Sequence, residues 1–193
     1  MNKIMNYKIN DNGFTLIELL VTIAIAAILI TVAVPGFRSV IQNNRASAQS
    51  NELLSAFALA RSEAVKRGVR VTACASDDQT DCDGAPNTDW EGGWIVFVDQ
   101  NNNGTFEGDG DANLCEVDAS NLPTEDCLIR AWDALKGTPT LTQTSGGSSV
   151  QYLASGLVAS TSNYFTFTAP DRDAKYICIN TTGRAQVKDT SCP

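Results

Sequence analysis

The chain of 193 residues contains no histidine and only two methionines. The lack of histidine excludes a Ser-His-Asp or Cys-His catalytic site, and it removes the nitrogen ligands of the usual zinc sites. No two cysteines have the Cys-x-x-Cys spacing that is typical of redox or zinc motifs. These absences predict a protein that is not an enzyme and needs no cofactor.

Positive charge is scarce in the second part of the chain. Residues 71–193 have a net charge of −12, whereas residues 38–70 have a net charge of +4. Because nucleic-acid binding relies on neutralising phosphates with Lys and Arg, the acidic part argues against general nucleic-acid binding. It favours a soluble, extracytoplasmic head. The contrast in charge has two interpretations. It could favour short-range contacts between the acidic head of one subunit and the cationic stem of another, or it could be an ordinary solvated surface.

One long apolar run extends from Phe14 to Val34 and contains a single charge, Glu18. At about 1.5 Å per residue, a helix of this length spans the ~30 Å hydrocarbon core of a bilayer. An ordinary signal peptide would have its small-residue cleavage site after the apolar run, but here Gly13 precedes it. A charge inside a membrane segment is costly, so Glu18 is a candidate functional residue.

The segment GFTLIELLVTIAIAAILITVAVPGF strongly resembles the signature of type IV pilins, which minor pilins and type II secretion pseudopilins share. The resemblance implies that residues 1–13 are a leader and that a prepilin peptidase cuts between Gly13 and Phe14. The same enzyme would methylate the new amine of Phe14. Glu18 matches the glutamate that pairs with the amine of a neighbouring subunit, and Pro35 matches the proline at which the stem curves.

The chain is predicted to form one helix from Phe14 to about Arg67. Its parts are a transmembrane or filament-core segment, 14–36, and an amphipathic segment, 37–68. Pro35 predicts an interruption and kink between them. In the second segment Leu53, Phe57, Ala60 and Ala64 share one helical face, which requires a sheet to cover it.

Residues 69–193 contain short β-prone runs separated by Gly, Ser, Asn and Pro, which predicts antiparallel β structure. With the helix, this gives an α+β fold of the type IV pilin kind, in which one long N-terminal helix packs on an antiparallel β-sheet head. The three tryptophans, Trp90, Trp94 and Trp132, are predicted to be core residues. The expected strands are 70–74, 90–98, 129–132, 141–142, 150–153, 164–167, 176–179 and 183–187.

All six cysteines lie in this predicted head. In an oxidising compartment an even number of cysteines predicts disulfides. Six cysteines allow fifteen connectivities, and proximity in the sequence favours three short loops. The favoured pairs are Cys74–Cys82, Cys115–Cys127 and Cys178–Cys192.

Several motifs narrow the resemblance to one branch of the pilins. The segments ARSEAVKRGVRVTACAS, WEGGWIVFVDQNNNG, IRAW and YICINTTGRAQV are similar to those of the GspH/FimT family, which includes FimU-like proteins. The resemblance implies a minor pilin that takes part in pilus assembly or initiation, near the tip. A GspH-type pseudopilin of a type II secretion system is the alternative. Either protein would insert once in the inner membrane with a periplasmic head, and would then join other pilins in a pilus or pseudopilus.

The run after residue 98 has the spacing of a calcium-binding loop. Asp99, Asn101, Asn103, Thr105 and Glu107 occupy positions 1, 3, 5, 7 and 9 of an EF-hand-like pattern. Gly104 stands at position 6, where the pattern needs a turn. Gly110 stands at position 12 in place of the bidentate glutamate, with Asp109 and Asp111 beside it as substitutes. A polar β-turn without calcium explains the same residues.

The last motif is Gly183-Arg184-Ala185-Gln186. Some FimT proteins bind DNA through a Gly-Arg-x-Arg motif near the C-terminus, and the resemblance makes Arg184 a candidate DNA contact. Gln186 replaces the second arginine of that motif, and Lys188 is the residue that could compensate. The alternative is a β-hairpin held by Cys178–Cys192.

Overall fold

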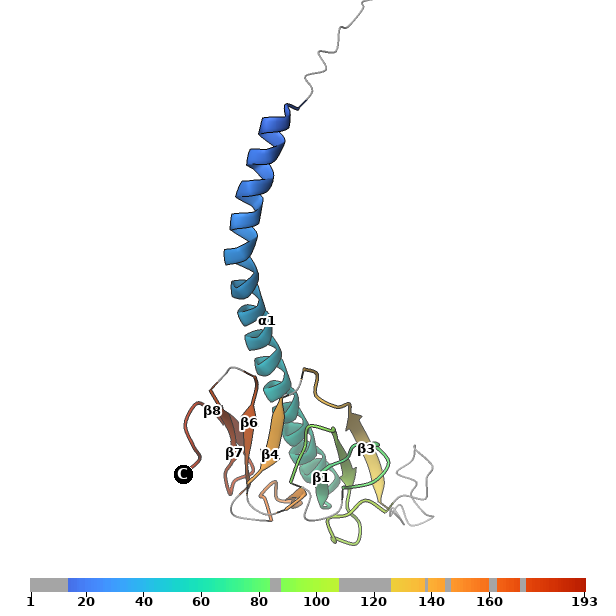
Figure 1. Cartoon of the computed structure of the whole chain (residues 1–193). Helices are drawn as coiled ribbons and strands as arrows, with labels where there is room; N and C mark the ends of the chain where they lie inside the picture. The colour runs from blue at the N-terminus through green and yellow to red at the C-terminus, as the bar shows by residue number, and fades with distance from the viewer. Residues whose placement is uncertain are drawn as a thin grey trace, which may run out of the picture. The chain divides into compact units, whose positions relative to one another are not determined.

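The computed structural model describes residues 14–83, 88–107, 126–137, 139–144, 147–159, 163–170 and 173–193. Within these ranges helix α1 (Leu16–Arg67) is followed by strands β1 to β8 (Figure 1). The chain divides into two compact units, one ending at Asn43 and one from Asn44 to Pro193. Residues 1–13, the predicted leader that ends at Gly13, lie outside the described part.

The N-terminal unit contains the first half of α1. The helix begins at Leu16 rather than at Phe14 because Thr15 is its N-cap: the Thr15 hydroxyl oxygen accepts the N–H of Glu18 at 3.3 Å. Helical structure continues through Pro35, in agreement with the prediction of one helix to about Arg67, and the kink at Pro35 stays a prediction. Proline removes only one N–H donor, and the hydrogen bonds of the neighbouring turns are enough to continue the helix.

In the second unit the rest of α1 supplies one wall of the core. Leu53, Phe57, Ala60 and Ala64 are all fully buried, which confirms the apolar face predicted from their spacing. The helix ends at Arg67, and Gly68 follows with a φ of +70° and an N–H donated to the Ala64 carbonyl oxygen at 2.9 Å. This is the left-handed C-terminal cap that glycine adopts at low cost.

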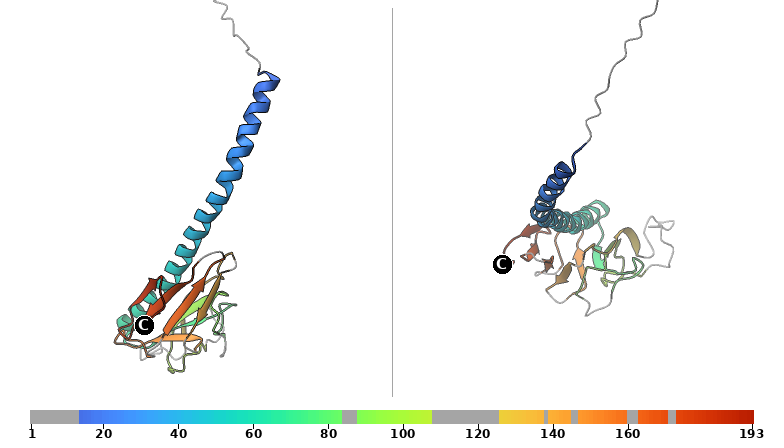
Figure 2. Two further views of the ribbon diagram at one scale, coloured as in Figure 1. Left: turned by 60° about the vertical axis from the view of Figure 1, so that its left-hand side comes forward. Right: turned by 45° about the horizontal axis from the view of Figure 1, so that its top comes forward.

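The strands form two antiparallel sheets of four strands each, in the orders β3-β2-β1-β5 and β4-β6-β7-β8. Figure 2 shows the strands of the head from two further sides. Each strand overlaps one of the eight predicted runs. The bounds are Val71–Ala75 for β1, Trp94–Val98 for β2, Cys127–Trp132 for β3, Thr140–Gln143 for β4, Ser149–Tyr152 for β5, Asn163–Thr168 for β6, Lys175–Ile179 for β7 and Ala185–Lys188 for β8.

Strand β2 starts later than predicted, at Trp94 instead of Trp90. The intervening residues form a turn that ends at Gly93, with a φ of +122°. A Cβ atom at Gly93 would collide with the carbonyl oxygens of Trp132 and Ser76, so this close approach requires glycine. The N–H of Trp90 instead donates to the Leu141 carbonyl oxygen at 2.7 Å, which places Trp90 beside β4.

The core contains the three tryptophans, as predicted. Trp90 contacts Phe165 of β6 at 4.9 Å between ring centroids and Phe57 of α1 at 6.1 Å. Trp94 of β2 stacks on Trp132 of β3 at 6.2 Å. The aromatic cluster around Trp90 therefore joins the helix to the second sheet.

The first sheet also buries its other face. Cys74, Ile95 and Phe97 are fully buried there, with Phe106 packed on Phe97 at 5.2 Å between ring centroids. The disulfide Cys74–Cys82 closes the same small cluster. Phe106 thus anchors the loop that follows β2 to the sheet.

Two of the three favoured cysteine pairs are disulfides in the structure, Cys74–Cys82 and Cys178–Cys192. Cys127 is disulfide-bonded too, and its predicted partner, Cys115, lies outside the described residues. We expect mass spectrometry of the non-reduced protein to find three intramolecular disulfides. Alkylation of any cysteine before reduction would contradict this prediction.

Candidate functional site

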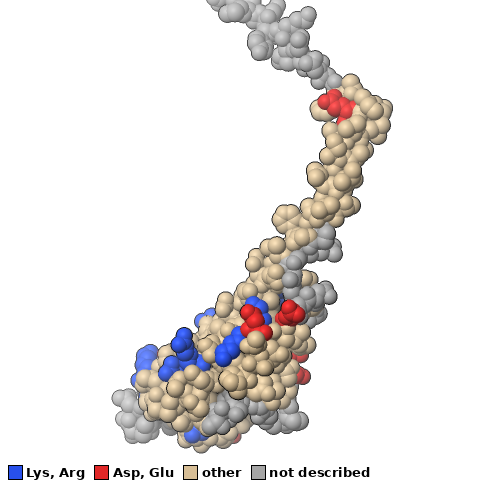
Figure 3. Space-filling model, turned by 90° about the vertical axis from the view of Figure 1, so that its left-hand side faces the viewer, with Lys and Arg blue, Asp and Glu red and all other residues tan. Residues whose placement is uncertain are grey.

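The first candidate site is the apolar part of α1. Leu16–Val34 has a mean hydropathy of 2.7, is long and apolar enough to cross a membrane, and contains no residue that is buried inside the protein. Figure 3 shows this stretch as uncharged except for one acidic side chain near its start. Phe14, next to the predicted cleavage point, has 75% of its surface exposed. Such a surface needs lipid or other helices to cover it.

Glu18 is that acidic side chain, and it lies in the first turn of α1. Its spacing from Thr15 is that of a capping box, in which the N3 glutamate faces the N-cap residue. A carboxylate in this turn is also favoured by the partial positive charge of the helix N-terminus. Sequence reasoning missed Thr15, although Thr-x-x-Glu before an apolar run is a recognisable helix start. Cleavage after Gly13 would place the amine of Phe14 one residue before this cap.

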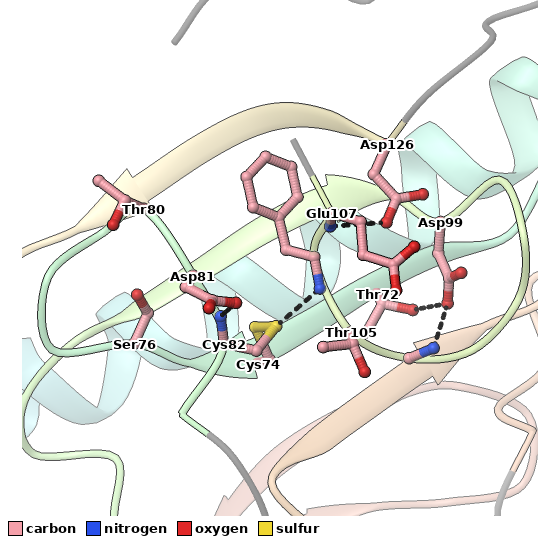
Figure 4. The surroundings of a disulfide bond; sticks show 12 residues. Thr72, Cys74, Ser76, Thr80, Asp81, Cys82, Asp99, Thr105, Glu107 and Asp126 are labelled. Atoms are coloured by element: carbon pink, nitrogen blue, oxygen red, sulfur yellow. Dashed lines mark hydrogen bonds between the residues drawn. A yellow bond between two sulfur atoms is a disulfide. The ribbon is translucent and has the colours of Figure 1, made fainter. Parts of the chain in front are cut away.

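The second candidate site is the loop that follows β2, from Asp99 to Glu107. Asp99 is 1% exposed, and its Oδ2 accepts hydrogen bonds from the Thr72 hydroxyl at 2.8 Å and the Gly104 N–H at 3.0 Å (Figure 4). The carboxylate of Glu107 accepts bonds from the side-chain amides of Asn101 and Asn103, at 2.8 and 2.9 Å. The structure therefore brings these predicted ligands onto one loop, while Gly110 and its flanking aspartates lie outside the described residues.

Asp126 joins this loop from the start of β3. Its carboxylate accepts the N–H of Gln100 at 2.8 Å and the N–H of Glu107 at 3.1 Å. Burial raises the pKa of Asp126, and the nearby charges of Asp99 and Glu107 add to this effect. Sequence reasoning missed Asp126 because it is separated from the motif by a long segment. Its position directly before the disulfide-bonded Cys127 gave no signal of this contact.

The residues of the DNA-binding hypothesis lie on the β7–β8 hairpin. Gly183 has a φ of +78°, and a Cβ atom there would collide with the carbonyl oxygen of Gly156. Arg184 is exposed, and its N–H donates to the Asn180 side chain at 2.9 Å. Lys188 is partly exposed at the end of β8. Turn geometry thus accounts for the glycine of the motif, and the disulfide Cys178–Cys192 closes the end of this hairpin.

An exposed apolar helix with one acidic residue near its start, and a helix packed on antiparallel sheets in a disulfide-bonded head, are the features of type IV pilin-like proteins. A family model described as type II transport protein GspH matches residues 49–183. A model of the prokaryotic N-terminal methylation motif matches residues 8–34. Because the first model covers more than half of the sequence, the chain belongs to the GspH family.

The fold is similar to that of crystal structures of the type IV minor pilin FimU from Pseudomonas aeruginosa. One has 19% sequence identity and a TM-score of 0.53, covering 78% of this chain and 94% of the FimU chain. Another crystal form has 18% identity and a TM-score of 0.50, covering 76% and 96%. No curated protein matches the chain.

These findings make the chain a minor pilin or pseudopilin of the type IV pilin family, with a structural rather than an enzymatic role. The methylation motif implies processing by a prepilin peptidase and association with other pilins. Together with the exposed apolar helix, it indicates a membrane-anchored protein with an extracytoplasmic head.

Proposed function

We propose that this protein is a minor type IV pilin that takes part in pilus assembly or initiation, after insertion in the inner membrane with its head in the periplasm. The observation that carries the proposal is the exposed apolar segment with a single charge at Glu18. In this proposal the peptidase cuts between Gly13 and Phe14, and Glu18 neutralises the methylated amine of Phe14 on a neighbouring subunit.

Electrostatics explains why such a pair would direct assembly. Two opposite charges about 4 Å apart attract by roughly 1 kcal/mol in water and roughly 4 kcal/mol at an effective dielectric constant of 20. An unpaired carboxylate or amine in an apolar environment is costly. The pair would therefore be stabilised where neighbouring apolar helices have excluded water, which is the interior of a filament.

The apolar segment supplies the rest of the association surface. Its exposed side chains include Ile23, Ile28 and Val32. In the membrane these side chains contact lipid, and in a filament they would pack against the helices of other subunits. Small side chains such as those of Ala24, Ala26 and Ala27 let helix backbones approach closely.

The proposal places the protein in a pilus rather than in a type II secretion machine. Its support is the similarity to two crystal structures of a type IV minor pilin, whose likeness extends over most of the chain. The family model carries the name of a type II transport protein. An experiment must therefore distinguish a pilus from a type II secretion machine.

Site-specific photo-cross-linking in native membranes tests this placement. A photoreactive amino acid would replace Ile28 in the apolar segment or Leu157, which is 45% exposed in the head. We expect both positions to capture major and minor pilins of a pilus, identified by mass spectrometry. A sample without irradiation is the control. Capture of pseudopilins of a secretion system instead would contradict the assignment to a pilus.

A further inference from the structure

A buried carboxylate oxygen without a partner lies in the loop that follows β2. Asp99 Oδ2 accepts two hydrogen bonds, but Asp99 Oδ1 is buried and has no hydrogen-bond partner among the described residues. In Figure 4 this second oxygen points into the ring that the chain traces between Asp99 and Glu107. Burying an anionic oxygen without a donor or a cation is unfavourable.

Two further acidic side chains, those of Glu107 and Asp126, belong to this loop or bond to its backbone. Asp126 holds both ends of the loop through the N–H groups of Gln100 and Glu107, which brings its carboxylate to the same region as those of Asp99 and Glu107. Within the described part of the chain, none of these three carboxylates forms an ion pair. The nearby Arg70 donates to the Asn102 carbonyl oxygen and the Gln151 side chain instead, at 3.2 and 2.9 Å.

We propose that this loop, together with Asp126, binds one calcium ion. Asp99 Oδ1, the carboxylates of Glu107 and Asp126, the side-chain oxygens of Asn101 and Asn103 and the carbonyl oxygen of Thr105 would supply the ligands, and the region between them would hold the ion. Calcium takes six to eight oxygen ligands in flexible geometry. Zinc would need nitrogen or sulfur ligands, and the described cysteines are in disulfides.

The site needs local rearrangement before it can close around an ion. Across the described residues, no group of three or more His, Cys, Asp or Glu side chains is already gathered for a metal. Glu107 is exposed and now accepts bonds from the two asparagine amides. Rotation of these amides would turn their oxygens toward the ion and release Glu107. It would break the two bonds to Glu107 and the two bonds that the Asn101 and Asn103 side-chain oxygens accept from the N–H groups of Asn103 and Thr105. The anchors Asp99, Asp126 and Phe106 are already in place.

Calcium titration of the full-length protein in detergent, after treatment with a chelator, tests the proposal. We expect isothermal titration calorimetry to show one site with a dissociation constant of about 10⁻⁴ to 10⁻³ M, the range of extracellular calcium modules. Calcium at about ten times that constant should raise the melting temperature by about 3–6 °C. Magnesium should bind more weakly, because it demands stricter octahedral geometry and keeps its waters.

Matched variants separate a built site from attraction to an acidic surface. Glu107→Gln and Asp99→Asn should each weaken calcium binding at least tenfold. Asp173→Asn removes one exposed negative charge at another part of the head and should change the affinity less than twofold. If Asp99→Asn disturbs folding because of its bonds to Thr72 and Gly104, the exposed Glu107 decides the result. No saturable binding up to 10 mM calcium, wild-type affinity in Glu107→Gln, or an equal loss in Asp173→Asn would each overturn the proposal.

Discussion

Replacing Glu18 with alanine should abolish most incorporation of the protein into filaments while leaving leader cleavage intact. The substitution removes the partner of a neighbour's amine, and a loss of roughly 4 kcal/mol at an intermediate dielectric constant corresponds to about a thousandfold in affinity. Desolvation offsets part of this attraction, so we expect at least a tenfold decrease. Immunoblots of sheared filaments against membrane fractions would measure it, and mass spectrometry of the N-terminus would report cleavage after Gly13.

A second variant, Glu18→Gln, separates the charge of this residue from its place in the helix cap. Glutamine at position 18 removes the charge but, like glutamate, can occupy the N3 position of a capping box with Thr15. If the charge is what matters, Glu18→Gln should fail in assembly as Glu18→Ala does. Normal incorporation of Glu18→Gln would show that the helix cap, not the ion pair, is the function of this residue. Glu52→Ala, an exposed glutamate on the same helix, is the matched control and should incorporate normally.

Much of the fold was predictable because it depends on local periodicity. The spacing of Leu53, Phe57, Ala60 and Ala64 identified the buried face of α1, and alternation located eight strands. The division into two sheets was not predictable, since it depends on pairings between distant segments, such as β1 with β5. The turn before Trp94 was read as part of a strand because its flanking tryptophans suit either structure.

The candidate sites were also predictable only where their signal lies in neighbouring residues of the sequence. Glu18 could be singled out because one charge interrupts a continuous apolar run, a signal contained in adjacent residues. The loop from Asp99 to Glu107 also has a local pattern. Asp126 could not be found, because its contacts with Gln100 and Glu107 arise only when β3 pairs with β2. The cap formed by Thr15 was missed, although its signal was present in the sequence.

The aromatic cluster around Trp90 identifies the position where one substitution should destabilise the head most. Trp90 is fully buried between Phe57 of α1 and Phe165 of β6. Its indole N–H donates to the Gln143 side chain at 3.2 Å. These contacts link the helix, the turn before β2 and the second sheet, so a cavity here would weaken several elements together.

We expect Trp90→Ala to lower the free energy of unfolding by about 3–5 kcal/mol, the range measured for large aromatic residues in cores. Trp90→Phe keeps much of the apolar volume and loses the indole donor, so it should cost about 1–3 kcal/mol. Leu157→Ala, at an exposed position, should change stability by no more than about 0.5 kcal/mol. Urea unfolding of the full-length proteins in detergent, followed by far-UV circular dichroism with the disulfides intact, would measure all three. Equal stabilities for Trp90→Ala and Leu157→Ala would mean that the cluster does not join the helix to the second sheet.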